Sequence, residues 1–202
     1  MLSKSGCLTL ILRGHHKMKG AFSVDELDEL GVNAKASARR RQHRNVHASY
    51  SEKIQRLFNA ICADSYIRPH RHTLDPRNET LVAVRGEFAA ITFADDGRIA
   101  DVVRFATEAH WAGDARVTVG IELSPETWHT IVALSDTAIL FEVKEGPFEP
   151  TIAKEYAPWA PEEGDGNVAA YLQWLKDQVV ARLSGGVHKL SSQGMLAKRD
   201  IP

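Results

Sequence analysis

The sequence predicts a mainly β chain that folds as one small sandwich or barrel. Short runs rich in β-branched and apolar residues recur through its middle, and turn-forming pairs such as Asp75-Pro76 and Ser124-Pro125 separate them. The intervals leave no room for crossover helices between the runs, which excludes an alternating α/β architecture. The expected strands are Leu81–Val84, Phe88–Phe93, Ile99–Phe105, Arg116–Leu123, His129–Leu134 and Ala138–Val143.

Two helices are expected before the barrel. Residues 1–20 are interpreted as an irregular lead-in, and residues 21–64 as a helical N-terminal segment. The sequence Ser23-Val-Asp-Glu26 is a capping box, and Gly31 is placed where a short helix would end. Residues 49–63 carry apolar side chains at the spacing i, i+3, i+4 and i+7, which predicts a second helix with one buried stripe.

The rest of the chain divides into three parts. Residues 65–163 are expected to form the barrel and a C-terminal covering segment, because residues 154–161 are rich in proline and aromatic side chains. Residues 164–184 are expected to form one C-terminal helix that Asp165 caps and that Gly185 ends, with Val168, Leu172 and Leu175 on its buried side. Residues 185–202 are polar and are expected to be a disordered tail.

Composition excludes several functional classes. The 202 residues include 25 basic and 26 acidic ones, and a formal net charge of -1 argues against bulk electrostatic capture of nucleic acid. Two cysteines make no disulfide framework and fit a reducing, cytoplasmic setting. The apolar run Leu8–Leu12 is too short for a signal-peptide core or a membrane span, so no membrane partner is expected.

The residues at the start of the barrel predict a metal site. In a strand, residues i and i+2 point to the same face, so His70 and His72 can present two imidazoles to one ion. Glu79 and His129 are the candidates for the remaining ligands, with Asp75 as the substitute carboxylate. Three nitrogens and one oxygen suit zinc, iron, manganese, nickel or cobalt, so ligand type alone does not select the divalent metal.

A basic patch at residues 38–47 has three interpretations. It lacks interleaved aromatic residues, which disfavours a nucleic-acid arm, and a solvated face is the plainest alternative. In the third interpretation, some of its arginines line the mouth of the pocket and bind an anionic substrate group. The candidate substrate-binding residues are Arg41, Asn45, His47, Tyr66, Arg68 and Trp128.

Several motifs, taken together, resemble the cupin superfamily. His70-x-His72, Glu79 and Gly86 follow the first cupin motif, and Trp128-His129 behind Pro125 follows the second loosely. The sequence departs from that pattern in the six residues between His72 and Glu79. The segments that extend the resemblance are Asn45–His47, Gln55–Ala60, Tyr66–His72, Trp128–Thr130, Phe141–Pro147 and Ala157–Pro161. In this order they are similar to WbuC-type cupin-fold metalloproteins over residues 23–163.

The resemblance implies a cupin double-stranded β-helix, or jelly roll, with one divalent metal ion held by His70, His72, Glu79 and His129. It also implies an association with O-antigen and other surface-polysaccharide biosynthesis. Cupin-like barrels commonly pair through strands, so the resemblance makes a homodimer the expected assembly.

Two functions of different classes remain open from the sequence. One is a metal-dependent enzyme, such as an isomerase, epimerase or oxygenase, that acts on a small polar molecule or an anionic sugar derivative. The other is a non-catalytic metal-dependent module that binds or senses a small molecule, which a coordinatively closed site would favour. A metal-free barrel used for protein contacts is disfavoured, because it would leave polar side chains converging in an apolar interior.

Overall fold

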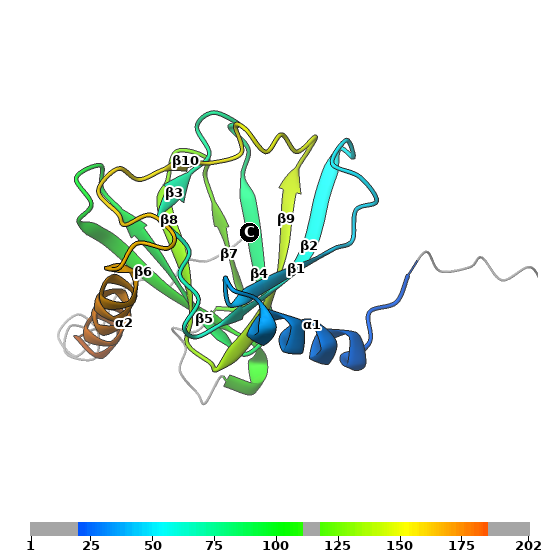
Figure 1. Ribbon diagram of the computed structural model, residues 1–202, viewed down its shortest axis with the longest axis horizontal. Coiled ribbons are helices and arrows are strands. Elements are labelled where there is room, and N and C mark those ends of the chain that lie inside the picture. Colours follow the sequence, from blue (N-terminus) through cyan, green and yellow to red (C-terminus); the bar gives the residue numbers. More distant parts are fainter. Residues whose placement is uncertain (1–19, 111–117, 186–202) are drawn as a thin grey trace, which may run out of the picture.

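Two five-stranded sheets face each other in the computed structural model, which describes residues 20–110 and 118–185 (Figure 1). The first sheet has the order β1 (Arg41–Asn45), β2 (Ile54–Cys62), β9 (Thr137–Glu145), β4 (Glu79–Arg85) and β7 (Gly120–Leu123). The second has the order β10 (Glu155–Tyr156), β3 (His70–Arg71), β8 (Trp128–Ala133), β5 (Glu87–Phe93) and β6 (Ile99–Ala106). The helices are α1 (Val24–Ala36), η1 (Glu108–His110) and α2 (Val168–Gly185).

The order of the strands identifies the architecture. Neighbouring strands within both sheets pair antiparallel. From β2 to β10 the chain passes to the opposite sheet at every step except the hairpin of β5 and β6. This alternation is that of a jelly roll, and it confirms the mainly β fold class that the sequence predicts.

The prediction of a helix over residues 49–63 is wrong, because this segment contains strand β2. Its odd positions, such as Leu57 and Ile61, face the barrel interior, whereas Phe58 and Cys62 pack against α1. A strand covered on both faces is apolar on both, so its hydrophobic pattern loses the period of two and resembles that of a helix. One N-terminal helix, α1, is therefore observed where two were expected.

Helix α1 begins at its expected capping box but extends beyond its expected end. Ser23 Oγ accepts from the backbone N–H of Glu26 at 3.2 Å, and the Glu26 carboxylate accepts from Ser23 N–H at 2.8 Å. Gly31 does not end the helix, which continues to Ala36. A Cβ built at Gly31 would lie 3.7 Å from Thr137 Cγ2, an ordinary van der Waals distance, so the packing of α1 on β9 does not require a glycine here.

Helix α2 covers the outer face of the second sheet (Figure 1). Leu172, Leu175 and Val179 are buried in a cluster that includes Ile91 and Val132 of that sheet. Asp165 Oδ1 accepts from the backbone N–H of Asn167 at 2.7 Å, directly before the helix begins. Neither α1 nor α2 has the length and apolar character that a membrane-spanning helix needs. The lead-in at 1–19 and the tail at 186–202 lie outside the described residues.

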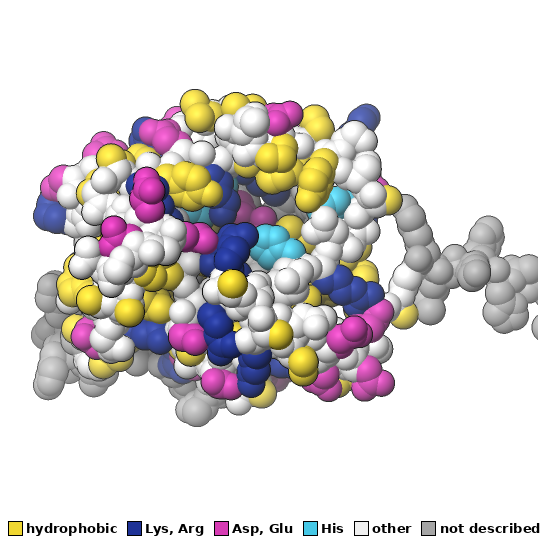
Figure 2. Space-filling model, viewed as in Figure 1, with side chains coloured by type: hydrophobic (Ala, Val, Ile, Leu, Met, Phe, Trp, Pro, Cys, Tyr) yellow, Lys and Arg dark blue, Asp and Glu magenta, His cyan; other side chains and the backbone are white. Residues whose placement is uncertain are grey.

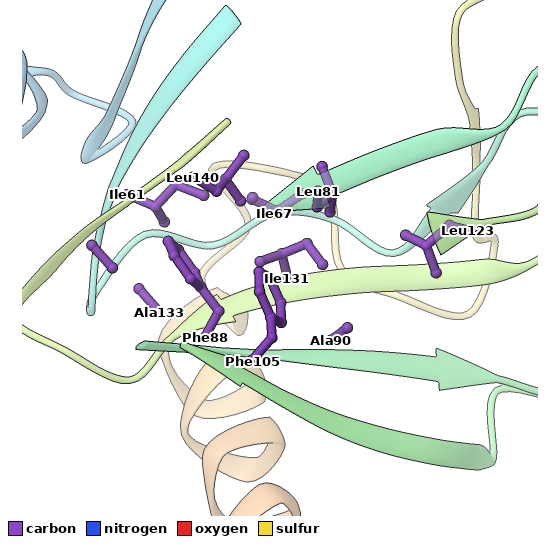
Figure 3. Close-up of a cluster of buried hydrophobic side chains, with 11 residues drawn as sticks. Ile61, Ile67, Leu81, Phe88, Ala90, Phe105, Leu123, Ile131, Ala133 and Leu140 are labelled. Carbon is purple, nitrogen blue, oxygen red and sulfur yellow. The ribbon is translucent and has the colours of Figure 1, made fainter. Parts of the chain in front are cut away.

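The apolar core lies between the sheets (Figure 3). Phe88 and Phe105 are both 0% exposed and stack at a ring-centroid distance of 5.1 Å. The core side chains that also line a polar cavity are Ile61, Ile67, Leu81, Ile131 and Leu140. The core therefore forms the apolar floor of that cavity.

The turn between β4 and β5 provides a test of the fold. Gly86 has φ +74°, and a Cβ there would lie 2.9 Å from Ala138 Cβ. Gly86→Ala is expected to lower the free energy of unfolding by about 2 to 4 kcal/mol, because a left-handed backbone and a steric overlap both oppose the methyl group. Urea denaturation measures the loss.

Gly164→Ala is the matched control. Gly164 has φ +94°, but nothing lies within 4 Å of an added Cβ, so only the backbone contribution of about 1 to 2 kcal/mol is expected. Equal losses in the two variants would show that the contact with Ala138 is not restrictive.

Candidate metal centre

An open cavity occupies the polar end of the barrel. Its volume is about 160 Å³, roughly ten times the space that one water molecule needs. Histidine and acidic side chains are visible inside a hollow on the face shown in Figure 2. Alternate residues of β1, β2, β4, β8 and β9 point into it, as the period of two requires.

Three buried histidines meet on one side of this cavity. His70 and His72 come from β3 and the residue after it, and His129 comes from β8, where it is the direct partner of His70. These residues are 4%, 2% and 1% exposed, respectively. One ring nitrogen from each lies within 4.8 Å of those of the other two, a spacing that a metal ion can bridge.

Backbone carbonyls fix the orientation of all three rings. Each Nδ1 lies at hydrogen-bond distance from a carbonyl oxygen, so Nδ1 carries the ring proton and Nε2 has the free lone pair. The acceptors are Arg68 O at 2.9 Å from His70, Ala153 O at 2.6 Å from His72 and Thr127 O at 2.8 Å from His129. Metal-binding histidines in proteins are commonly held in this way.

Glu79 completes a set of four donor groups. Its Oε2 lies 3.5 Å from His72 Nε2 and 3.3 Å from His129 Nε2. Neither ring nitrogen has a hydrogen-bond partner within the described residues, although both are fully buried. An unpaired buried nitrogen costs free energy, so the arrangement fits a cation placed among these four groups.

The charge states of the buried groups agree with this arrangement. Burial, followed by the positive charge of Lys154, lowers the pKa of His70 well below its usual value, so this imidazole is neutral at pH 7. Burial alone would raise the pKa of Glu79, but His129 and His72 lower it well below its usual value when their Nε2 atoms carry a proton. A cation in the same place would also hold the carboxyl as an anion. A neutral imidazole and a carboxylate are the protonation states that bind metals.

A second carboxyl group lies beside the first. Burial, followed by the negative charge of Glu79, raises the pKa of Glu142 well above its usual value. Glu142 lines the cavity from β9, in register with Leu81 of β4 and Leu57 of β2. The pKa values of the two acidic side chains are therefore shifted in opposite directions.

The cationic side chains of the cavity differ in whether they have a partner. Arg39 and Arg41 both pair with Glu163, and Lys144 Nζ lies 3.9 Å from Asp75 Oδ2. Lys154 differs from these three, because no ion pair or hydrogen bond of its amine is found within the described residues. Lys154 lines the cavity, and burial lowers the pKa of its amine while the charges of Glu79 and Glu142 oppose this shift.

The structure brings together part of the candidate set. The three histidines form one cluster, Glu79 lies beside two of them, and Arg41, Asn45 and His47 line the cavity from β1 and the residues after it. Arg41 is bound to Glu163 and to Tyr66 O, so its guanidinium has protein partners. The substitute carboxylate Asp75 pairs with Arg77 and Lys144 and lies outside the histidine cluster.

The other three candidates for substrate binding do not line the cavity. Tyr66 donates its hydroxyl to Pro161 O, and Trp128 donates Nε1 to Asp95 Oδ1. Arg68 donates to Ala157 O and pairs with Glu162. Trp128 faces away from its neighbour His129 in strand β8, as the period of two requires. Tyr66 and Arg68 precede β3 and contact the covering segment.

Four residues that sequence reasoning missed also line the cavity: His43, Gln55, Asn59 and Lys154. The period of two in β2 would have found Gln55 and Asn59 if that segment had been interpreted as a strand. Lys154 has no local signal, because the covering segment reaches the cavity only through long-range contacts such as Ala153 O with His72.

Comparison with known proteins gives limited information. Residues 22–105 match a family described as a domain of unknown function (DUF6016). The matched range includes three of the four candidate ligands and ends before His129. No curated protein matches the sequence.

Solved structures similar to the chain share little sequence with it. Protein SO0799 from Shewanella oneidensis is 9% identical, with 56% of this chain and 72% of that chain covered and a TM-score of 0.45. KdgF from Halomonas sp. is 14% identical, with 55% and 83% covered and a TM-score of 0.39. A variant of the oxalate decarboxylase OxdC from Bacillus subtilis is 16% identical, with 56% and 27% covered and a TM-score of 0.41.

The fold assignment rests on the strand order. The chain has a jelly-roll fold, the architecture that its resemblance to cupins implies. In this fold, the three histidines and Glu79 lie on the inner faces of both sheets and line the cavity.

Proposed function

We propose that this cupin-fold chain binds one divalent metal ion through His70, His72, His129 and Glu79, and that it is a metal-dependent enzyme acting on a small anionic molecule. The observation that carries the proposal is the common orientation of the three rings. Each Nδ1 faces a backbone carbonyl, and the buried Nε2 atoms of His72 and His129 have no protein partner within the described residues.

The donor set fits a transition metal better than a hard cation. Imidazole nitrogens suit zinc, iron, nickel and manganese, whereas calcium and magnesium prefer sites built from oxygen. When bound, such an ion supplies Lewis-acid chemistry, which polarises a carbonyl or lowers the pKa of a coordinated water. The chain's own residues hold the ion, shape the cavity and position the substrate beside it.

Charge supports an anionic substrate. A divalent ion with Glu79 as an anion leaves one net positive charge on the metal and its ligands, because imidazoles that bind a metal are neutral. Lys154 adds a second positive charge without a carboxylate partner within the described residues. A carboxylate or phosphate in the cavity would bind both charges.

The finer parts of the proposal rest on the sequence resemblance. Similarity to WbuC-type proteins supports a sugar-derived substrate and a place in surface-polysaccharide biosynthesis. Isomerisation, epimerisation and oxygenation are the reactions we propose for such a substrate. Glu142 lies beside Glu79, and its raised pKa favours the protonated form. We propose that Glu142 exchanges a proton with the substrate.

Cobalt substitution tests whether the site is open. Cobalt(II) bound to the protein has visible absorption bands that depend on its coordination, and azide is a small probe that occupies an exchangeable position. We expect azide to change these bands, because catalytic sites retain an open position. Unchanged bands at saturating azide would contradict an enzyme and favour the closed site of a binding or sensing module.

Lys154 gives a second test of the anionic substrate. Lys154→Gln is expected to weaken malonate binding to the zinc-loaded protein about tenfold, because one charge-assisted hydrogen bond contributes roughly 1.5 to 3 kcal/mol. Isothermal titration calorimetry measures the dissociation constant. Lys176→Gln, on helix α2, makes the same change of charge away from the cavity and is expected to leave malonate binding unchanged. Equal affinities in both variants would contradict the role of Lys154.

A further inference from the structure

We propose that the wall of the cavity formed by β1 and β2 is a subsite for hydroxyl groups, and that the substrate is therefore a polyhydroxylated acid. The inference rests on the proposed function for the metal end of the cavity. Three side chains form this hydroxyl subsite: His47, Gln55 and Asn59.

All three are buried and polar. Each residue is 6% exposed, and each has a fully buried nitrogen or oxygen atom without a hydrogen-bond partner within the described residues. The atoms are His47 Nε2, Gln55 Oε1 and Asn59 Oδ1. Buried polar atoms in proteins are nearly always hydrogen-bonded, so three orphans on one wall indicate that something else binds there.

The orientation of Gln55 is fixed by the protein. Its Nε2 donates toward the carbonyl oxygens of Ser49, Tyr50 and Glu52, at 3.4, 3.2 and 2.8 Å. A flipped amide would place its oxygen against three carbonyl oxygens, which repel it. Oε1 therefore remains the atom without a partner, and it can only accept a hydrogen bond. The group that binds it must be a donor.

His47 is held on its other side. Its Nδ1 lies 3.0 Å from Arg56 N and 2.9 Å from Arg56 O, so it either accepts from the first or donates to the second, and in both tautomers Nε2 is left without a partner. Asn59 follows Gln55 on the same face of β2, with Leu57 between them on that face. No hydrogen bond of the Asn59 amide is found within the described residues, so it can turn to donate or accept.

A hydroxyl group is the chemistry that satisfies this wall. It donates to Gln55 Oε1, and it either donates or accepts at Asn59 and His47. A carboxylate lacks the donor that Gln55 requires, and an apolar group would leave all three atoms unpaired at a cost of roughly 1 to 3 kcal/mol each.

The strand register places the subsite within reach of the metal centre. Glu79 of β4 is the partner of Lys144 of β9, which is the partner of Gln55 of β2. Two spacings between neighbouring strands put the backbones of Glu79 and Gln55 roughly 10 Å apart. A six-carbon chain can therefore place an acid group at the metal and Lys154 while its far hydroxyls reach β2.

Calorimetry on the zinc-loaded full chain tests this subsite with three six-carbon probes. Gluconate has the acid and the hydroxyls, 2-hydroxyhexanoate has the same metal-chelating end without the far hydroxyls, and sorbitol has hydroxyls without the acid. We expect gluconate to bind at least about tenfold more tightly than either of the other two. Equal affinity for gluconate and 2-hydroxyhexanoate would overturn the hydroxyl subsite. Equal affinity for gluconate and sorbitol would overturn the claim that the acid group contributes to binding.

Asn59→Leu localises the effect. This change removes the amide without breaking a hydrogen bond found in the structure, so we expect gluconate affinity to fall about tenfold and 2-hydroxyhexanoate affinity to stay unchanged. Asn33→Leu, on α1 outside the cavity, is the control and should leave both affinities unchanged. Asn59→Ser keeps a hydroxyl at the position and is expected to restore part of the gluconate affinity.

The outcomes separate this inference from the proposed function. Equal weakening of both acids by Asn59→Leu, with zinc still bound, would overturn the subsite and leave the metal centre intact. A parent protein that binds no zinc would instead contradict the proposed function itself. Zinc content and circular dichroism of each variant show which case applies.

Discussion

Replacing His129 with alanine is expected to lower the affinity for zinc by at least about 100-fold. Loss of a partner that merely orients a metal ligand costs roughly 10 to 100-fold in affinity, and loss of the ligand itself costs more. His129 is 1% exposed, and its Nε2 is fully buried without a hydrogen-bond partner in the described chain. Competition with a fluorescent zinc chelator at pH 7.5 measures the change.

His43→Ala is the control for this prediction. His43 lines the same cavity from β1 but is not part of the histidine cluster, so its loss is expected to leave zinc affinity within about threefold of the parent. Similar losses in both variants would indicate that the cavity binds zinc without a defined ligand set. Unchanged zinc affinity in the His129 variant would contradict the proposal that this histidine is a metal ligand.

The largest effect on stability is expected at Phe88. Its side chain is 0% exposed and stacks on Phe105 at 5.1 Å between the two sheets (Figure 3). Phe88→Ala is expected to lower the free energy of unfolding by about 3 to 5 kcal/mol, because it removes buried apolar surface and leaves a cavity in a packed core. Urea denaturation in the presence of a chelator measures this loss without a contribution from bound metal.

Ile54→Ala gives the matched comparison. Ile54 begins β2 and is 53% exposed, so its truncation is expected to cost less than about 1 kcal/mol. A loss of less than about 1 kcal/mol in the Phe88 variant would contradict the assignment of this residue to the centre of the core.

The strands of the barrel and the cluster of three histidines could be predicted because both have local signals in the sequence. Period-two runs and turn pairs predicted strands close to β4, β5, β6, β8 and β9, and the structure confirms the mainly β fold. The spacing of His70 and His72 placed two imidazoles on one face by the geometry of a strand. Residues 111–117 lie outside the described chain, so only the later part of the expected strand 116–123 is seen, as β7.

The opposite wall of the cavity was not predictable in the same way. Phe58 and Ile61 lie on opposite faces of β2, and both faces are buried, so their spacing imitated that of a helix. This error concealed Gln55 and Asn59, which carry the further inference. Lys154 and the carbonyl of Ala153 belong to the segment that folds back over the barrel and reaches the cavity. Ala153 lies 81 residues along the chain from His72, so no local pattern relates the two.

The metal content of the protein tests the central claim most directly. The chain is purified without an affinity tag, stripped with a chelator, reconstituted separately with iron, manganese, nickel and zinc, and analysed by mass spectrometry of its elements. We expect about one tightly bound ion per chain for at least one metal, because three oriented imidazoles and one carboxylate form a single site. No retained metal after any reconstitution of the folded protein would contradict the account.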